Sequence, residues 1–439
     1  MKKIFSLVLI SVTLLLYLGG IPTRSGPAGV QASVLGQGFT TTSSGGPISS
    51  PFVIADQPVS ASTPAVAYNS QQQEYMVVWW NDRPGNDDIY GQRISKTGTR
   101  IGPWFAIAYG SGYDRRYPCV AYNSLTNEYL VTWYQFDSSD VYSVQGQRLS
   151  ATGQPQGGAI DIGAGTSSLM YFYSAVAYDP TDDKYLVLYT SFVASSYKHA
   201  VLAQAFNSNG STWGASFEIA PNLDAVGWLD LAYNSLRNEF LVVWDQTGSQ
   251  ADVMARRVKM TGGAGVLGSI LPISTDTSND DSLARVAAVP RSPDGQYLVV
   301  WGHCENNPNC SAEDTQAQLV SGEGNLEGGI ITFPTPFDMV LYADVAGCAQ
   351  SNAYFVAWMQ TSTFPPGIIV GDIAARFVST GGGLEPEFWL GGDSALSPAV
   401  TCGPNGDYLV AFMNTSPTSD FDILGRLVGN RLYLPLVEK

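Results

Sequence analysis

The chain of 439 residues contains only two histidines, His199 and His303. Hydrolysis by a serine nucleophile needs a histidine that takes the proton of the hydroxyl group. His199 stands where a loop is expected to enter a strand, and His303 stands beside a predicted disulfide. We therefore assign neither histidine as a general base, and the sequence argues against a serine-type hydrolase.

Signatures for phosphate and calcium binding are also missing. The run Thr380-Gly381-Gly382-Gly383 has neither the lysine nor the following helix that a phosphate-binding loop requires, so we interpret it as a turn. No segment matches the calcium loop, which needs alternating acids and a glycine at its sixth position. No segment shows helical periodicity either. The chain thus lacks a motif that names a reaction, and we expect no cofactor and no bound metal.

Charged residues make up only 14% of the chain, and acids exceed bases by 38 to 22, which gives a net charge of −16. Residues 1–32 contain Lys2, Lys3 and Arg24 but no acid, so their removal would change the charge from −16 to −19. An acidic surface repels nucleic acid and anionic lipid but suits cations or basic partners. With 12% aromatic residues, 46 glycines and 25 prolines, the composition is typical of a globular all-β protein.

The N-terminus has the pattern of a secretory signal peptide. Lys2 and Lys3 precede an apolar run from Ile4 to Leu18, and a small-residue site ends at Ala32. The alternative is an uncleaved membrane anchor, but some 15 apolar residues fall short of the roughly 20 that span a bilayer. We expect a signal peptide at 1–32, a flexible segment at 33–50, no membrane span after cleavage, and a secreted or cell-surface protein.

One phrase is repeated seven times along the chain. Its first copy reads Ala65-Val66-Ala67-Tyr68-Asn69, then a short turn, then Glu74-Tyr75-Met76-Val77-Val78-Trp79. The aromatic residues that close the seven copies follow one another at intervals of 54 to 57 residues: Trp79, Trp133, Tyr189, Trp244, Trp301, Trp358 and Phe412. Such a period indicates one supersecondary unit copied around an axis or along a stack. A residue that recurs at one register serves the unit, so we expect the closing aromatics in the core.

Each unit is predicted to form four antiparallel strands. The phrase and its turn predict a β-hairpin. A third strand follows, such as Asp88–Ile94 or Asp252–Val258, and then a short fourth strand, such as Trp104–Ile107 or Ile270–Ile273. Seven such units predict an all-β fold, a seven-bladed β-propeller over 51–430, which we expect to be a monomer.

The two ends of the repeat region complement each other. The last unit stops after its third strand, Asp422–Leu427, whereas an orphan strand of the fourth type, Phe52–Ala55, precedes the first unit. Pairing of these two strands would close the ring and remove its open edges. The segment Leu432–Val437 competes for this place, but Pro435 disfavours a central strand, so we expect a C-terminal tail at 431–439.

The repeat resembles those of secreted bacterial seven-bladed propellers, in which a tyrosine-asparagine hairpin and a tryptophan-ending strand precede an Asp-Ile-Tyr-Gly-Gln-Arg strand. The nearest copies here are Asp88–Arg93 and, more loosely, Tyr142–Arg148, and the likeness covers about residues 60 to 430. These propellers are mostly of unassigned function, so the resemblance implies architecture and export. It departs from the sialidase pattern, because the run Gly210-Ser211-Thr212-Trp213 has Ser208 where an aspartate box needs aspartate.

The five cysteines fit an oxidising compartment, in which pairing is expected. Cys304 and Cys310 flank a short loop and are predicted to form a local disulfide, with a metal site that adds His303 as the less favoured alternative. Cys348 and Cys402 each precede a closing aromatic by ten residues, so they could join two neighbouring units. Cys119 is left over, and we interpret it as a small buried residue.

The connections differ between the two faces expected of the ring. First-to-second and third-to-fourth turns are short and nearly uniform, whereas second-to-third connections vary, and variable loops on a uniform scaffold usually carry binding function. Fourth-to-first connections reach the variable face and carry aromatic residues that could stack on a sugar or an extended peptide. The predicted ligand-binding residues are Tyr113, Tyr117, Tyr171, Tyr173, Trp228 and Tyr342, with Phe172 beside them. Packing between blades is the alternative role for each.

Two sets of acids also qualify as candidate sites. Aspartate begins the third strand of five units, at Asp88, Asp252, Asp314, Asp372 and Asp422. A ring of carboxylates could hold calcium, although a hydrogen bond within each turn is the favoured interpretation. Glycoside cleavage would need two carboxylates about 5 to 10 Å apart, and the candidates by position are Asp114, Asp137, Asp230, Asp280, Asp281 and Asp344. The sequence therefore predicts a secreted module that binds glycan or protein, with a carbohydrate-active hydrolase or lyase as the alternative.

Overall fold

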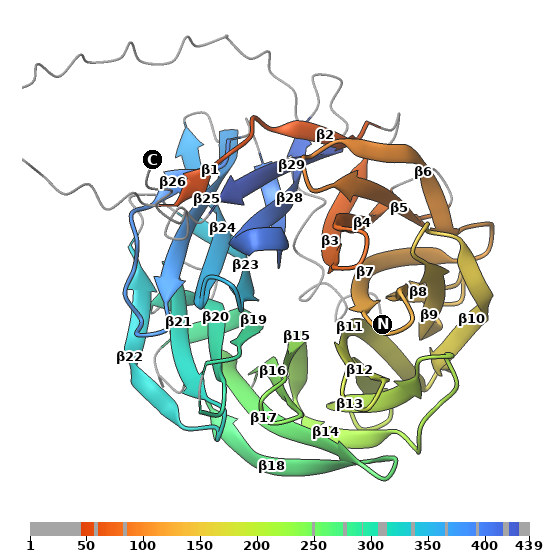
Figure 1. The fold of residues 1–439 in the computed structure, drawn as a ribbon. Helices are drawn as coiled ribbons and strands as arrows, with labels where there is room; N and C mark the ends of the chain where they lie inside the picture. The colour runs from red at the N-terminus through yellow and green to blue at the C-terminus, as the bar shows by residue number, and fades with distance from the viewer. Residues whose placement is uncertain are drawn as a thin grey trace, which may run out of the picture. The chain divides into compact units, whose positions relative to one another are not determined.

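The repeated hairpin forms the inner half of an antiparallel sheet in each of seven blades (Figure 1). The computed structural model describes residues 45–56, 60–81, 86–247, 251–274, 279–291, 293–305, 314–334, 339–364, 368–391, 395–415 and 421–429. Six sheets have four strands, and the seventh has five. The first strand of each blade lies nearest to the central axis (Figure 1). The predicted seven-bladed propeller is thus confirmed.

The strands of blades 1 to 4 follow one another in chain order. Blades 1 and 2 consist of β3 (Ala61–Asn69), β4 (Glu74–Asn81), β5 (Asp88–Ser95), β6 (Arg100–Ala108), β7 (Asp114–Asn123), β8 (Glu128–Phe136), β9 (Tyr142–Ser150) and β10 (Pro155–Gly163). Blades 3 and 4 consist of β11 (Leu169–Asp179), β12 (Lys184–Val193), β13 (Lys198–Asn207), β14 (Phe217–Leu223), β15 (Ala225–Asn234), β16 (Glu239–Thr247), β17 (Ala251–Thr261) and β18 (Ala264–Pro272).

Blades 5 and 6 consist of β19 (Asn279–Val289), β20 (Gln296–Glu305), β21 (Asp314–Ser321), β22 (Leu326–Phe333), β23 (Met339–Cys348), β24 (Ala353–Phe364), β25 (Ile368–Ser379) and β26 (Phe388–Trp389). Blade 7 contains β27 (Ala395–Cys402), β28 (Asp407–Thr415) and β29 (Phe421–Gly429). A 3₁₀ turn at Pro404–Gly406 joins β27 to β28. Within the described part of the chain, no helix is both long and apolar enough to cross a bilayer.

The strand that completes blade 7 comes from the other end of the repeat region. β2 (Phe52–Ala55) pairs antiparallel with β29, with Phe52 opposite Gly425 and Val53 opposite Leu424. A further short strand, β1 (Gly46–Pro47), pairs with the end of β29. The predicted closure is confirmed. The signal peptide expected at 1–32 and the tail expected at 431–439 lie outside the described residues.

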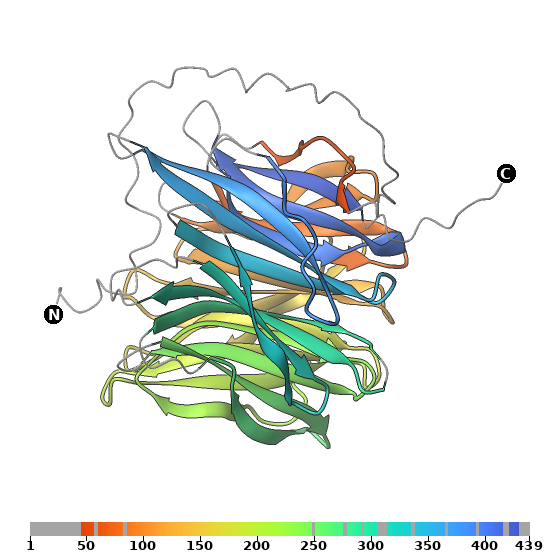
Figure 2. The same cartoon turned by 90° about the vertical axis from the view of Figure 1, so that its left-hand side faces the viewer.

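The strands of every blade run between two loop-bearing faces (Figure 2). Second-to-third and fourth-to-first connections share one of them, which we name the loop face. First-to-second and third-to-fourth turns share the other, which we name the turn face.

Apolar side chains pack in seven clusters, each shared by two neighbouring blades. The closing aromatic of each unit enters the cluster with the preceding blade. Trp133 of blade 2, for example, packs with Met76 and Val78 of blade 1. Burial of one large apolar side chain contributes about 1.5 to 3 kcal/mol, so the recurring aromatic stabilises the contact between blades. Its predicted core role is confirmed.

The asparagine of the repeated phrase ties neighbouring blades together. Asn123 Oδ1 accepts hydrogen bonds from Leu125 and from one further backbone N–H of its own turn, while its Nδ2 donates to Asp183 of blade 3. Asn69 shapes its own turn in the same way and donates from Nδ2 to Asn127 of blade 2 at 2.9 Å. One side chain thus both closes a turn and links two blades.

The glutamine of the third strand acts within its own blade. Gln92 Nε2 donates to three backbone carbonyl groups, those of Arg93, Ile101 and Gly102. Gln147 makes the same set of bonds in blade 2. This residue therefore donates to backbone carbonyl groups where the fourth strand bulges. The glutamine recurs because the scaffold of the blade requires it.

Cys348 and Cys402 form a disulfide between blades 6 and 7, with their Cα atoms 5.5 Å apart. The link that the sequence left possible is present, and strand pairing places the two cysteines at different positions of the repeat. Val345 and Val400 hold equivalent positions, so Cys348 lies three residues after its reference and Cys402 only two. Cys348 therefore occupies the position that Asn69 holds in blade 1. In blade 6 a covalent bond replaces the asparagine tie.

Of the other three cysteines, the structure describes one bonded and one free residue. Cys304 is disulfide-bonded, and Cys310, its predicted partner, lies outside the described residues. Cys119 carries a free thiol.

Replacing both Cys348 and Cys402 by serine should lower the free energy of unfolding by about 3 to 5 kcal/mol, because the disulfide closes a loop across 54 residues of sequence. Thermal unfolding followed by calorimetry would measure the loss. Cys119→Ser, which removes a thiol but no disulfide, is the control and should change stability much less. Equal melting of the double variant and the parent would contradict the role given to this bond.

Candidate functional site

Each first strand contains a β-bulge close to the loop face, where one extra residue interrupts the pairing with the second strand. The bulged residues are Thr63, Tyr117, Tyr173, Trp228, Leu283, Tyr342 and Ser397. All except Trp228 have a positive φ, between 39° and 62°, which is uncommon outside glycine. Because the bulge recurs in every blade, it belongs to the scaffold, while the side chain that it carries differs between blades.

Three of these side chains meet across blades 2, 3 and 4. The ring centroids of Tyr117 and Trp228 lie 5.3 Å apart, those of Tyr173 and Trp228 5.3 Å, and those of Tyr117 and Tyr173 5.9 Å. Tyr134 stacks on Tyr117 at 5.7 Å with an interplanar angle of 17°. We name these four residues the aromatic arc. Such contacts contribute about 0.5 to 1.5 kcal/mol each, so the rings hold one another in place.

Further aromatic side chains extend the arc toward blade 1. Trp80 lies 6.3 Å from Tyr117, and the guanidinium group of Arg116 lies over both Trp80 and Phe136 at 5.1 and 5.3 Å. Arg116 is also paired with Asp87. Bulge positions of blades 1, 5 and 7 carry threonine, leucine and serine, and blade 6 carries Tyr342. The aromatic rings that contact one another in and beside the arc come from blades 1 to 4.

Charged side chains lie beside the arc, two residues after the bulge in three blades. They are Asp230, Arg285 and Asp344, whereas blades 1, 3 and 7 carry alanine at this register. The Arg285 guanidinium lies 4.9 Å from the ring of Trp228, and its Nε lies 3.9 Å from Asp344. A cation over an indole face is attracted to it, so Arg285 links the arc to the acids.

These acids also satisfy the inner edges of neighbouring blades. Asp230 accepts a hydrogen bond from the Val286 N–H of blade 5 at 3.0 Å, and Asp344 accepts one from the Val400 N–H of blade 7 at 2.7 Å. Cys119 donates from its thiol to the Ser174 carbonyl of blade 3. First strands have no neighbour on the axial side, so these side chains meet backbone groups that the sheet leaves unpaired.

A further carboxylate, Asp245, follows the closing aromatic of blade 4 and accepts a hydrogen bond from the Trp228 N–H at 2.8 Å. Burial raises the pKa of Asp245 to about 7. Burial also raises the pKa of Asp344 to about 7, against the opposing effect of Arg285, and raises the pKa of Asp230. Cys119 stays a thiol, because burial raises its pKa to about 12. Two carboxyl groups beside the arc can therefore exchange protons near neutral pH.

The structure thus brings together three of the predicted ligand-binding residues, Tyr117, Tyr173 and Trp228. Tyr342, from blade 6, is close enough to raise the pKa of Tyr117, although burial is the larger cause. Tyr171 instead packs on Tyr189, with ring centroids 5.5 Å apart. That these residues contact a ligand stays a prediction.

The outlying predicted aromatics do not join the arc. Tyr113 is 41% exposed and lies 5.6 Å from the Arg115 guanidinium, and Phe172 packs on Tyr142. Two aromatics that the sequence analysis did not single out are more exposed. Tyr109, before β7, is 70% exposed, and Tyr197, between β12 and β13, is 68% exposed.

Arg285, Asp245 and Tyr134 were also absent from the prediction. One sequence signal could have found the last two, because both directly follow a closing aromatic. Nothing comparable marks Arg285, whose place depends on the bulge before it.

The other candidate carboxylates have separate local roles. Asp114 accepts a hydrogen bond from the Asp87 N–H, and Asp280 accepts one from the Ala251 N–H. Asp137 closes a turn by accepting bonds from two backbone N–H groups. Asp281 lies 2.7 Å from His303 Nδ1 in a buried pair. Of the six acids proposed from sequence, Asp230 and Asp344 are the two that share the Arg285 cluster.

Two of the aspartates that begin third strands have different partners, and Asp88 departs from the expected bond within its own turn because its partners lie in or beside blade 2. Asp88 accepts a hydrogen bond from the Gly110 N–H and pairs with Arg115 at 3.3 Å. Asp372 accepts a bond from the adjacent Ile373 N–H. Among the residues that the structure describes, no group of three or more His, Cys, Asp or Glu side chains could hold a metal ion. Calcium binding by this ring gains no support from the described residues.

The first strands of the seven blades together line a concave region toward the turn face, with a volume of about 440 Å³. It is lined by the repeated Val-Ala-Tyr segments, including Tyr68, Tyr122, Tyr178 and Tyr233 in blades 1 to 4. The tyrosine hydroxyls of blades 2, 3 and 4 are bonded to residues of their own turns, for example Tyr178 to Asp183 at 2.8 Å. These tyrosines therefore support turns.

No family model and no curated protein matches this chain. A solved structure of an unknown-function protein from Dyadobacter fermentans is similar, with 12% identity, a TM-score of 0.54, and coverage of 88% of this chain and 99% of that one. An intramolecular trans-sialidase from Ruminococcus gnavus gives 8% identity, a TM-score of 0.47, and coverage of 88% and 98%. A Hadza microbial sialidase gives 10% identity, a TM-score of 0.46, and coverage of 80% and 76%. At these identities, the first match supports the propeller fold alone, and the other two carry no argument about function.

Because burial raises the pKa of Asp344 above its ordinary value, the folded state holds this proton more tightly than the unfolded state does. The contribution to stability is present at low pH and is lost as pH rises from about 4 to about 7. Asp344→Asn keeps an acceptor for the Val400 N–H but does not titrate. Relative to the parent, the variant should gain on the order of 1 to 3 kcal/mol of unfolding free energy between pH 4 and pH 8.

Chemical denaturation at several pH values would measure this difference. Asp56→Asn, at a carboxylate whose side chain is 55% exposed, is the control and should show no comparable trend. A constant difference between parent and Asp344→Asn across this pH range would show that Asp344 does not titrate as described.

Proposed function

We propose that this chain is a secreted binding module that recognises a glycan through its loop face. The observation that carries the proposal is the aromatic arc with Arg285 and three carboxylates beside it, at positions where blades differ from one another. A sugar ring presents flat C–H surface together with polar edges, so it can stack on an aromatic face while its hydroxyls bond to acids or a guanidinium group. Exposed Tyr109, Tyr113 and Tyr197 offer further stacking surface on the same face.

Export is part of this proposal. The Cys348–Cys402 disulfide suits an oxidising compartment, in which such bonds persist. The signal pattern at 1–32 and the acidic composition agree with a secreted or cell-surface module. We propose a monomeric propeller over 51–430 behind that signal peptide. An extended peptide is the other ligand that could use stacked tyrosines, and it is treated as an alternative outcome of the binding test.

A carbohydrate-active hydrolase is the second candidate, and the raised pKa values of Asp245 and Asp344 favour it. One protonated and one ionised carboxyl group is the pair that glycoside cleavage uses. Both groups, however, already accept backbone hydrogen bonds, from Trp228 and Val400 respectively. A structural use accounts for their burial, so binding stays the first proposal.

Glycan and peptide arrays probed with the purified exported chain would test the binding proposal. We expect saturable binding to a glycan, with at least about tenfold weaker affinity for Trp228→Ala and for the exposed pair Tyr109→Ala and Tyr197→Ala. Trp104→Ala, at a tryptophan that is 42% exposed on outer strand β6, is the matched control and should bind like the parent. Binding to peptides alone, or to nothing, would refute the glycan proposal.

The hydrolase candidate predicts a different result. Incubation with a panel of polysaccharides should release no reducing sugar if the chain only binds. Release that disappears in both Asp245→Asn and Asp344→Asn, while binding persists, would establish the hydrolase and overturn the binding-only proposal.

A further inference from the structure

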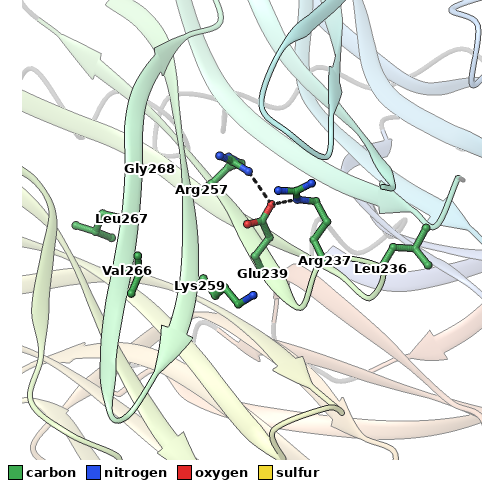
Figure 3. Close-up of a pocket in the computed structure, with 8 residues that line it drawn as sticks. All are labelled: Leu236, Arg237, Glu239, Arg257, Lys259, Val266, Leu267 and Gly268. Carbon is green, nitrogen blue, oxygen red and sulfur yellow. Dashed lines mark hydrogen bonds and ion pairs between the residues drawn. The ribbon is translucent and has the colours of Figure 1, made fainter. Parts of the chain in front are cut away.

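A pocket of about 470 Å³ lies on blade 4 beside the turn face (Figure 3). Residues from three strands and one turn line it: Leu236, Arg237, Glu239, Arg257, Lys259, Val266, Leu267 and Gly268. Figure 3 shows Arg237 and Arg257 both directed at the carboxylate of Glu239. This region is separate from the aromatic arc, which lies at the loop face.

The glutamate–arginine pair at the centre of the pocket recurs in other blades. In blade 1, Arg93 binds Glu74 through both Nε and Nη2, each at 2.8 Å. In blade 2, Arg148 binds Glu128 through the same two atoms. These pairs join the start of the second strand to the third strand. The pair therefore belongs to the scaffold that the blades share.

Blade 4 departs from this arrangement. Arg257 reaches Glu239 only through Nη1, at 3.2 Å, because Arg237 Nε occupies the same carboxylate oxygen at 2.8 Å. Arg237 stands at the position of Gln72 in blade 1. Arg257 Nη1 also donates to the Gly322 carbonyl. Its Nε and Nη2 have no hydrogen-bond partner among the described residues, so donors used in blades 1 and 2 are available here.

A second added cation is Lys259, which stands at the position of Ser95 in blade 1 and lines the pocket. Its ammonium group has no hydrogen bond or ion pair among the described residues. Arg237 is different, because its Nη1 lies 3.9 Å from Asp294 and 3.8 Å from Glu323, in addition to the bond with Glu239. The cationic donors left for a ligand are therefore those of Arg257 and Lys259.

Aliphatic surface lies next to these cations. Leu236 is 49% exposed and Val266 is 59% exposed, and both line the pocket. Pockets that hold small molecules commonly combine apolar walls with a few convergent polar groups. Guanidinium and ammonium groups bind carboxylates through charge-assisted hydrogen bonds.

We propose that this pocket binds a small organic carboxylate, with the carboxylate group on Arg257 and Lys259 and an aliphatic body against Leu236 and Val266. The site is independent of the glycan proposal, since it uses other residues on another part of blade 4. Failure of the carboxylate proposal would leave the glycan proposal standing, and failure of the glycan proposal would leave the carboxylate proposal standing.

Calorimetric titration of the full exported chain with hexanoate would test the proposal, with hexanamide as the uncharged ligand of the same length. We expect saturable binding of hexanoate and at least about tenfold weaker binding of hexanamide. Inorganic sulfate should compete poorly, because it has no aliphatic body. Absence of hexanoate binding, equal binding of hexanamide, or full competition by sulfate would each overturn the proposed ligand class.

The double variant Arg237→Gln with Lys259→Ser returns blade 4 to the residues that blade 1 carries at these positions. Such residues are compatible with a folded blade, so we expect an unchanged melting temperature within a few degrees and at least tenfold weaker hexanoate binding. Lys96→Ser, at the third-to-fourth turn of blade 1, is the matched control and should bind like the parent. Undiminished binding by the double variant would refute the site.

Discussion

Contact between neighbouring blades is the constraint on which the rest of this structure depends. A four-stranded sheet with one apolar face against each neighbour has no interior of its own, and all seven apolar clusters are shared by two blades. The closing aromatics, the asparagine ties of Asn69 and Asn123, and the Cys348–Cys402 disulfide all act at such contacts. Much of what recurs in the sequence therefore serves the contact between a blade and its neighbour.

This division explains why the fold could be read from the sequence. The period of 54 to 57 residues, the hairpin pattern and the orphan strand Phe52–Ala55 are properties of the scaffold, and scaffold requirements repeat. The position of each residue within the repeat was harder to predict from the sequence. Cys348 and Cys402 lie at equal distances from their closing aromatics, yet pairing places them one position apart, because the turn in blade 7 is one residue shorter than the turn in blade 6. Turn lengths change register without changing the apparent period.

The candidate site was only partly accessible from sequence, for a related reason. Aromatics such as Tyr117 and Trp228 could be proposed because their residue type is informative wherever they lie. Arg285 and Asp245 could not, since a single charged residue on a strand gains meaning only when the bulge and the curvature of the ring bring it beside its partners. Asp230 and Asp344 were among six acids of equal merit until the structure showed which two flank Arg285.

Closure by β2 and β29 affects when the apolar surface of the first blade is covered during synthesis and folding. The last strand of blade 7 pairs with a strand that precedes blade 1, so Phe52 meets Gly425 across almost the whole sequence. During synthesis the apolar face of the first blade that packs on blade 7 stays uncovered until the final strand is made. Contacts between distant parts of a chain form slowly, so an emerging chain exposes apolar surface until its two ends meet.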